Sequence, residues 1–471
     1  MARHMLFRAW LAIGCLMILA RGAAAADPAA NDGKPAPAAT PDIGAHPDPD
    51  AKPPVDPAAE ERDQKEFYEL YRSLADTVDQ VDRNYVKKVD RRELMEAAIK
   101  GILTKLDPYS SYIPPDEAGH FRDTVENQFG GIGIQITIDD SQLKILSPLA
   151  GTPAYKAGLL AGDRIVKIGD EATAGLSLDD AVHKLKGDVG TSVKLTIVHP
   201  GQHKAETFTV NREVIHIDTV LGDRRKSDDS WDFMLDPERK IGYIRITTFS
   251  RDTAADLKKA LEDLKARKLR GLILDLRFDP GGLLTAAVDT CDLFLTEGRI
   301  VSTEGRNSPK RVWDATKKSE AFTGFPMVVL VNRYSASASE IVSACLQDHQ
   351  RAIVVGERSW GKGSVQNVIE LEEGKSLLKL TTASYLRPNG HNIHRFPDSK
   401  ETDEWGVSPN PGFELKYSDA ELADELGDRR DRDIVVPHEK PAASPPGPDH
   451  FDDRQLQKAV DYLTGELARA K

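Results

Sequence analysis

The chain has 471 residues, of which 40% are hydrophobic and 29% are charged, and its formal net charge is −12. A chain of this length has room for two or three domains with cores of their own. The acidic balance argues against a general nucleic-acid-binding protein, which needs an excess of cations facing phosphates. Three cysteines are too few for a disulfide scaffold or for a zinc site built from four thiolates. No apolar run reaches the roughly 20 residues that span a bilayer, which excludes a multi-pass membrane protein.

Residues 1–26 have the features of a secretory signal peptide. Three basic residues lie among the first eight, an apolar run follows at 9–20, and alanines precede Asp27. The protein is therefore predicted to be exported, to a periplasm or to the medium, while an uncleaved signal would leave it attached to the membrane. Of the cysteines that remain, Cys291 and Cys345 lie in apolar stretches, which favours buried free thiols over a disulfide.

A helical segment follows a stretch that should not fold. Residues 27–58 are rich in proline, alanine and aspartate, and they contain too little apolar surface to offset the entropy of ordering. From Phe67 to Val81 the apolar residues follow helical spacing. A second helix is predicted from about Arg92 to Leu106, where Asp107-Pro108 ends it.

Two further modules follow in the chain. Short strands separated by glycines, with one helix near Ser177 to Lys186, predict a small β-rich domain. From Ile241 onward, apolar strands alternate with helices, a pattern typical of an α/β domain with largely parallel strands. The predicted organisation is a signal peptide at 1–26, a disordered linker at 27–58, a helical region at 59–127, a β-rich domain at 128–214, an α/β core at 215–417 to which part of 59–127 contributes, and a polar linker with a last amphipathic helix at 418–471.

Three turns of the α/β region could carry chemistry. Asp279-Pro280-Gly281-Gly282 follows a buried strand, and its backbone N–H groups could bind an anion, although such a motif by itself is more often an ordinary glycine turn. Residues 334–340 follow the next buried strand and could expose a serine or simply cap a helix. Residues 356–362 match the phosphate-binding pattern G-x-x-x-x-G-K. However, Gly363 replaces the serine or threonine of that pattern and a strand follows, so no nucleotide is expected.

Taken in order, four segments resemble those of the C-terminal processing peptidases, or tail-specific proteases, which are serine peptidases with a Ser-Lys pair. The segments are GIGIQI, LDLRFDPGGLL, VNRYSASASEIV and GERSWGKGSVQ. The resemblance spans residues 64 to 410, and it implies an α/β multidomain protein. In that arrangement a helical N-terminal segment and a small PDZ-like domain come before an α/β Ser-Lys protease core. Residues 395–405 look like an insertion relative to the family.

The resemblance assigns a role to each position that matches the family's motifs. Ser337 matches the nucleophile, Lys362 the general base, and Gln366 the group that orients the lysine amine. Asp348 matches an acidic position linked to activity, for which a structural role is an equal alternative. The oxyanion hole would be formed by the backbone N–H groups of Ala338 and of Gly281 or Gly282.

These residue types suit the chemistry. A serine hydroxyl is a poor nucleophile until another group takes its proton. A lysine with an ordinary pKa is almost fully protonated at neutral pH, but burial disfavours its cation. We therefore expect Lys362 to be buried, with glycines on either side that let the backbone pack closely around it. A Ser-His pair using His349, His391 or His394 is the alternative, and neither a metal nor another cofactor is predicted.

The β-rich domain resembles a PDZ domain. The stretch Gly130-Gly131-Ile132-Gly133-Ile134 matches the loop and strand that hold a peptide's C-terminal carboxylate with backbone N–H groups. The predicted partners are the C-terminal tails of protein substrates, with no nucleic acid and no nucleotide. The terminal helices could pair two copies of the chain, although packing within one chain is their commoner role. A PDZ adaptor on an inactive protease core is the alternative function, and the presence of both Ser337 and Lys362 favours the enzyme.

Overall fold

The computed structural model describes residues 57–126, 128–316, 321–435 and 451–470. The predicted signal peptide and nearly all of the predicted linker at 27–58 lie outside these residues. The described residues up to Tyr112 belong to one unit and those from Ile113 onward to another. Within the described ranges, no helix is both long enough and apolar enough to cross a membrane.

The first unit is helical, as its apolar spacing predicted. It contains α2 (Pro57–Asn84) and α3 (Arg91–Leu103), and the short strand β1 (Ser111–Ile113) runs across its boundary with the second unit. The Asp90 carboxylate accepts hydrogen bonds from the N–H groups of Arg92 and Glu93, which fixes the start of α3. In the second unit, α4 (Pro115–Glu126) precedes the β-rich domain.

The β-rich domain is an antiparallel sheet with one helix beside its edge strand. Strands follow the order β3-β4-β5-β7-β8, and β6 pairs with β5. Their bounds are Ile134–Asp139 (β3), Gln142–Pro148 (β4), Arg164–Ile168 (β5), Glu171–Ala172 (β6), Ser192–Val198 (β7) and Glu206–Asn211 (β8). Two helices, α5 (Pro153–Lys156) and α6 (Leu178–Leu185), accompany the sheet, and β2 (Gln128–Gly131) pairs with β9 (Glu213–His216) where the chain enters and leaves the domain.

The centre of the α/β core is a sheet with the strand order β10-β14-β15-β18-β19, in which β13 also pairs with β14. Strands β14 (Ile241–Ile246), β15 (Gly271–Asp275), β18 (Met327–Val331) and β19 (Ile353–Gly356) are parallel to one another. Strands β10 (Val220–Leu221) and β13 (Met234–Asp236) are antiparallel to β14. The carboxyl ends of the parallel strands therefore meet at one edge of the sheet, where polar turns can be brought together.

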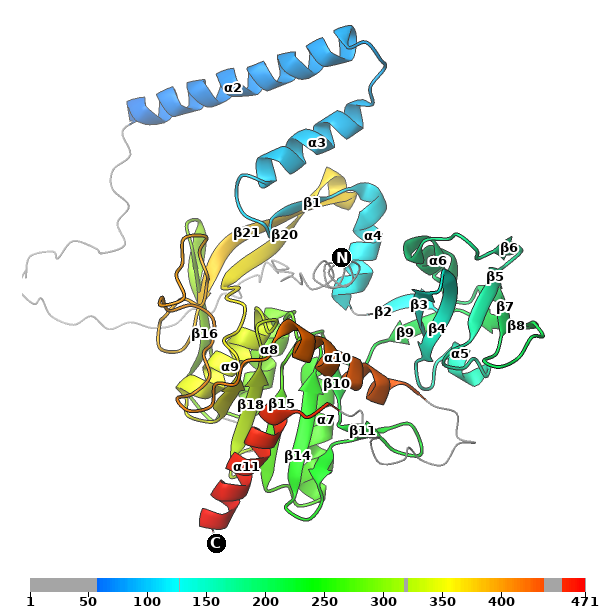
Figure 1. Cartoon of the computed structure of the whole chain (residues 1–471). Coiled ribbons are helices and arrows are strands. Elements are labelled where there is room, and N and C mark those ends of the chain that lie inside the picture. The colour runs from blue at the N-terminus through cyan, green and yellow to red at the C-terminus, as the bar shows by residue number, and fades with distance from the viewer. Residues whose placement is uncertain (1–56, 127, 317–320, 436–450, 471) are drawn as a thin grey trace, which may run out of the picture. The chain divides into compact units, whose positions relative to one another are not determined.

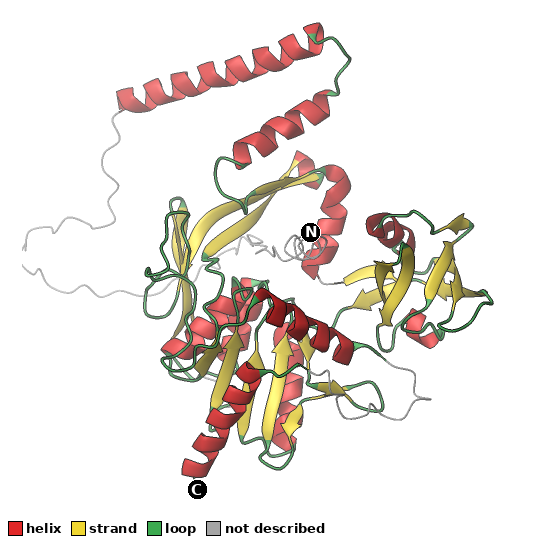
Figure 2. Ribbon diagram, viewed as in Figure 1, coloured by secondary structure: helices red, strands yellow, loops and turns green. Residues whose placement is uncertain are grey.

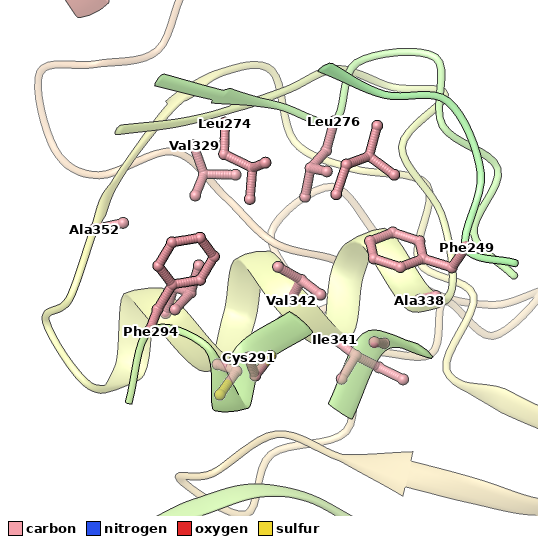
Figure 3. Packing of buried hydrophobic residues seen from close by; sticks show 14 of the residues in the cluster. Phe249, Leu274, Leu276, Cys291, Phe294, Val329, Ala338, Ile341, Val342 and Ala352 are labelled. Atoms are coloured by element: carbon pink, nitrogen blue, oxygen red, sulfur yellow. The ribbon is translucent and has the colours of Figure 1, made fainter. Parts of the chain in front are cut away.

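Both faces of this sheet are covered by helices (Figures 1 and 2), which explains why its strands are continuous apolar runs. Helices α7 (Thr253–Ala266), α8 (Leu284–Asp292) and α9 (Ala338–Asp348) share one buried apolar cluster with the sheet. Figure 3 shows Leu274 and Val329 of the sheet opposite Val342 of α9. On the other face, Ala459, Leu463 and Leu467 of α11 (Arg454–Arg469) pack on the sheet.

A second, antiparallel sheet lies beside the core. Strand β21 (Ser376–Leu386) pairs with both β20 (Ser364–Leu371) and β16 (Arg299–Gly305), and β16 pairs with β17 (Ser308–Asp314). A turn of 3₁₀ helix, η1 (Glu372–Gly374), joins β20 to β21. The minor strands β11 (Arg224–Arg225) and β12 (Trp231–Asp232) form a separate hairpin.

The segment after residue 417 differs from the polar linker that its composition predicted, because it contains a helix, α10 (Asp419–Asp433). The Ser418 hydroxyl accepts a hydrogen bond from the Glu421 N–H, and the Glu421 carboxylate accepts one from the Ser418 N–H. The buried face of α10 presents Glu425 and Arg429 instead of a continuous apolar stripe. Hydropathy therefore gave no indication of this helix, and the Ser-x-x-Glu capping pattern at its start was a sequence signal that the prediction did not use. The Pro-rich stretch at 437–448 lies outside the described residues.

Candidate active site

Ser337 lies at the turn between β18 and α9, at the carboxyl edge of the core sheet. Its φ is +57° and its ψ is −112°, a conformation that non-glycine residues seldom adopt. Its N–H donates a hydrogen bond to Oε2 of Glu340 at 2.8 Å. A backbone held in so rare a conformation by its surroundings is a common feature of functional turns.

The glycine turn predicted for the oxyanion hole lies directly against Ser337. A Cβ added to Gly281 would come within 2.7 Å of the Ser337 Cβ and 2.8 Å of the Ala338 nitrogen, so only glycine fits there. The Gly281 N–H is donated to Oδ1 of Asp279 at 2.8 Å. Since that donor is already used, the Gly282 and Ala338 N–H groups are the better candidates for binding an oxyanion.

Lys362 lies between β19 and β20, and only 4% of its surface is exposed. The Tyr385 hydroxyl donates a hydrogen bond to its carbonyl oxygen. A Cβ on Gly361 would lie 2.7 Å from the Arg395 Cβ, and a Cβ on Gly363 would lie 2.5 Å from the His394 nitrogen. The lysine loop is thus tightly enclosed, and both glycines are needed for that close approach.

A carboxylate that the sequence reasoning did not assign connects the serine turn to the lysine loop. Oε2 of Glu340 accepts hydrogen bonds at 2.8 Å from the Ser337 N–H and from the Lys362 N–H. Oε1 accepts from the Ser359 hydroxyl at 2.6 Å and from the Gly361 N–H at 2.7 Å. Burial raises the pKa of Glu340, and these four donors oppose that shift. A glutamate three residues after the serine, within one small-residue motif, was the available indication.

Gln366 lies on β20, four residues beyond Lys362, and is 3% exposed. Its side-chain amide donates to the Ser364 hydroxyl at 2.8 Å and to the Thr381 hydroxyl at 3.3 Å. These bonds fix the orientation of the amide next to the lysine loop.

Asp348 lies at the opposite end of α9 from Ser337, roughly 16 Å away along the helix at about 1.5 Å per residue. Its carboxylate forms an ion pair with Arg387 at 2.6 Å and accepts a hydrogen bond from the Asn389 side chain. The structure therefore does not bring Asp348 to the serine and the lysine, and its contacts connect α9 to the loop after β21.

Only one of the three histidines considered as an alternative base lies beside the lysine loop. His394 accepts a hydrogen bond from the Gly363 N–H through Nδ1 at 3.3 Å. The His349 ring bonds to the carbonyl of Arg299, and His391 pairs with Glu404. Within the described ranges, no cluster of three or more histidine, cysteine or acidic side chains could hold a metal ion.

The predicted peptide-binding stretch of the β-rich domain divides into two parts. Gly130 and Gly131 pair with β9 as part of β2, whereas Ile132 is buried in the domain core. Gly133 has a φ of +78°, and its carbonyl accepts bonds from the Leu149 N–H and the Thr152 hydroxyl. Ile134 then begins β3, the edge strand of its sheet. An extended peptide could add to the open side of this strand, alongside α6.

Cys291 on α8 and Cys345 on α9 are buried free thiols, the state that their apolar surroundings favoured. Burial, and then a hydrogen bond with Cys345, raises the pKa of Cys291 well above its ordinary value. Neither thiol is poised as a nucleophile.

Family models match most of the chain. The model of peptidase family S41 matches residues 240–407, that of the PDZ domain residues 144–198, and that of the N-terminal domain of the activating protease CtpB residues 48–117. Together with the fold, these matches define a serine peptidase that carries a PDZ domain.

Two similar proteins narrow the identification. A carboxy-terminal-processing protease of Bartonella bacilliformis is 36% identical over 419 residues, which cover 86% of this chain and 91% of that protein. The carboxy-terminal processing protease CtpB of Bacillus subtilis is 37% identical over 317 residues, covering 67% and 64% respectively. The chain therefore belongs to peptidase family S41, among its carboxy-terminal processing proteases. A solved photosystem II D1 C-terminal processing protease is 29% identical with a TM-score of 0.41, covering 73% of this chain and 92% of that one.

Proposed function

We propose that the protein is an exported endopeptidase that recognises the C-terminal tails of protein substrates through its PDZ domain and cleaves them with a Ser337–Lys362 pair. The observation that carries this proposal is the Glu340 carboxylate, one oxygen of which binds the backbone N–H of both residues. The nucleophile and the base are thereby held on neighbouring loops by one buried group.

In the proposed reaction, Lys362 carries the proton between the serine and the leaving group. The neutral Lys362 amine takes the proton of the Ser337 hydroxyl as the oxygen attacks the scissile carbonyl, and the Gly282 and Ala338 N–H groups bind the resulting oxyanion. The Lys362 ammonium then returns the proton to the departing amine. Water attacks the acyl-enzyme by the same route, and release of the acid regenerates the serine.

Substrate recognition is assigned to the PDZ domain because its edge strand β3 is open and lies beside α6. Backbone hydrogen bonds to an added strand recognise a chain end without depending on its whole sequence. The names of the similar proteins agree with action at carboxyl termini.

The test uses the chain from residue 27 onward, an unfolded reporter with a free carboxyl terminus, and mass spectrometry of the fragments. Ser337→Ala should lower turnover by at least about 10³-fold, because the covalent route is lost. Ser343→Ala, which alters a buried serine on the same helix, should cleave like the wild type. Turnover by a folded Ser337→Ala protein would refute the assignment, and an inactive wild type that still binds tails would favour the adaptor.

Export has its own test. The protein recovered from outside the cytoplasm of a bacterial host should begin at or near Asp27, as shown by N-terminal sequencing. Retention of residues 1–26 on the mature protein would contradict the predicted cleavage.

A further inference from the structure

Asp279 is a fully buried carboxyl group inside the turn that supplies the oxyanion hole. Its Oδ1 accepts the Gly281 N–H at 2.8 Å, while its buried Oδ2 accepts no hydrogen bond from the residues that the structure describes. Its backbone carbonyl accepts the Ala336 N–H at 3.0 Å and the Ser339 hydroxyl at 2.9 Å. This residue therefore connects the glycine turn to the serine turn through its main chain and holds the glycine turn through its side chain.

In the part of the chain that the structure describes, no cation compensates a negative charge at this position. Among the described residues, no lysine, arginine or histidine forms an ion pair with Asp279. The Arg277 guanidinium, two residues earlier, pairs with Asp275, Glu425 and Asp453.

The other charged groups near the site are the Glu340 carboxylate, which faces the backbone N–H groups described above, and Lys362 on the adjacent loop. An ionised Asp279 would thus be a buried anion whose only opposing influences are the Gly281 N–H and the Ser339 hydroxyl, with no cation of the described ranges beside it.

A charge at Asp279 would also oppose catalysis. The turn binds the oxygen on which negative charge develops during attack, and a second negative charge in this dry site would repel it strongly. A neutral carboxyl group avoids that repulsion, while its carbonyl oxygen still holds the Gly281 N–H.

We propose that Asp279 acts as a neutral carboxylic acid, a positioning residue that keeps the Gly281–Gly282 turn aimed at the oxyanion while its own proton remains on Oδ2. Burial raises the pKa of Asp279 well above its ordinary range, although hydrogen bonds from the Gly281 N–H and the Ser339 hydroxyl oppose that shift. The inference rests on the proposed Ser-Lys function, and it deepens that function by adding a second titrating group.

If Asp279 is protonated, both the turnover and the stability of the protein should fall when pH rises and the proton is lost. Loss of the proton at alkaline pH should lower turnover, because it places an anion beside the oxyanion. Since the raised pKa belongs to the folded protein, the protonated form is favoured there, and stability should fall as pH rises from the ordinary aspartate range toward that raised pKa. The amide introduced by Asp279→Asn cannot ionise, so this variant should show neither effect.

The experiment compares wild type with Asp279→Asn, Asp279→Ala and the control Asp292→Asn, which alters another buried carboxyl group of the same domain. Asp279→Asn should keep kcat within about tenfold at neutral pH and lose the alkaline decline. Asp279→Ala should lower kcat about 10²-fold with a smaller change in KM. The Gly281 N–H loses its acceptor, so the glycine turn no longer holds the N–H groups of the oxyanion hole in position. Asp292→Asn should keep the alkaline decline of the wild type.

Infrared spectroscopy of the resting enzyme supplies a readout that does not depend on activity. One component of the protonated-carboxyl absorption should be present in wild type and in Asp292→Asn and should be missing from Asp279→Asn, as a difference spectrum shows. A folded but inactive Asp279→Asn protein, or an unchanged carboxyl band, would overturn the proposal. Turnover by Ser337→Ala would instead refute the Ser-Lys function, and the infrared result would still report the state of Asp279.

Discussion

Glu340 shows how a single side chain can fix the relative positions of two loops, the serine turn and the lysine loop. It is fully buried, and each of its carboxylate oxygens accepts two hydrogen bonds. The rare backbone conformation of Ser337 persists because the bond to Glu340 and the start of α9 hold it on both sides.

Glu340→Gln should therefore impair both activity and stability. An amide keeps one acceptor oxygen but turns an NH₂ group toward N–H donors, which leaves two buried donors unpaired at about 1–3 kcal/mol each. We expect kcat to fall about 10²-fold, as displaced catalytic groups commonly cause. Urea unfolding and steady-state kinetics measure the two effects, with the exposed Glu297→Gln as control. Wild-type kcat in Glu340→Gln would show that the carboxylate is not needed for alignment.

Lys362→Arg should be inactive although it keeps the positive charge. Only a neutral amine can accept the Ser337 proton, and arginine has a pKa above about 12. In the wild type, activity should accordingly rise with pH as Lys362 loses its proton. The assay uses one unfolded substrate, with the fold checked by circular dichroism. An active Lys362→Arg, or an inactive but folded His394→Ala, would point to histidine as the base.

At the scale of elements, the C-terminal helices are attached to the core by a buried cluster of charges. Arg277, after β15, pairs with Asp275 and with Glu425 of α10 at 2.7 Å each, and with Asp453 at the start of α11 at 2.8 Å. Arg429 pairs with Asp275 at 2.6 Å and with Glu425 at 2.8 Å. Each charge in this cluster is paired with charges of the opposite sign, so removal of one side chain leaves a buried charge without a partner.

Arg429→Met should destabilise the protein by about 3–5 kcal/mol, since it leaves the Asp275 and Glu425 charges without one of their two cations. The matched control is Arg430→Met, one position along α10, where the side chain is exposed and should contribute within about 0.5 kcal/mol. Urea unfolding gives the free energies, and hydrogen exchange in α10 locates the loss. Equal stability of the two variants would mean that the cluster does not hold α10.

The same cluster predicts a sensitivity to acid. Burial alone would raise the pKa of Asp275, but the charges of Arg277 and Arg429 and the hydrogen bonds of Arg277 together outweigh burial and hold that pKa below its usual range. Burial is also the largest single influence on Asp453, and the combined effect of Arg277, Arg429 and the Leu456 N–H lowers its pKa. Their stabilising contribution is therefore present above an ordinary aspartate pKa of about 4 and is lost as pH falls through the lower folded values. Exchange in α10 and α11 should rise below about pH 4, and protection that did not change would contradict this.

At the scale of the whole molecule, recognition and chemistry are assigned to different domains. The open edge of β3 offers backbone groups to a peptide, while the serine, lysine and glycine turns gather at the carboxyl edge of the core sheet. The division implies that tail affinity and bond cleavage can be altered separately.

Amidation of a substrate tail should weaken its binding without changing the chemistry of the site. A free carboxylate would accept charge-assisted hydrogen bonds worth about 1.5–3 kcal/mol each from the stretch that ends at Ile134. Titration of folded Ser337→Ala with free-acid and amidated peptides measures the difference in Kd. Equal affinities would exclude a carboxylate-binding loop.

The sequence predicted the local features that a short stretch of chain controls. Apolar spacing placed the principal core helices and strands, because one buried face imposes a period of 3.6 or 2 residues. The double glycine at 281–282 and the glycines flanking Lys362 marked close backbone approaches. Family motifs added roles to Ser337, Lys362 and Gln366 that spacing alone could not supply.

The tertiary structure decided which distant groups meet. Asp348 lies only eleven residues after Ser337 in the sequence, yet the two residues are at opposite ends of α9. Glu340 and Asp279 lie within the quoted motifs, but their importance follows from donors that folding brings from other loops. The sequence by itself determined the order of the modules and the core strands, because burial patterns are local. Only the three-dimensional structure decided the contacts of α10 and the partners of each buried carboxyl group, because a charged side chain is stabilised in the interior by neighbours that are remote in the chain.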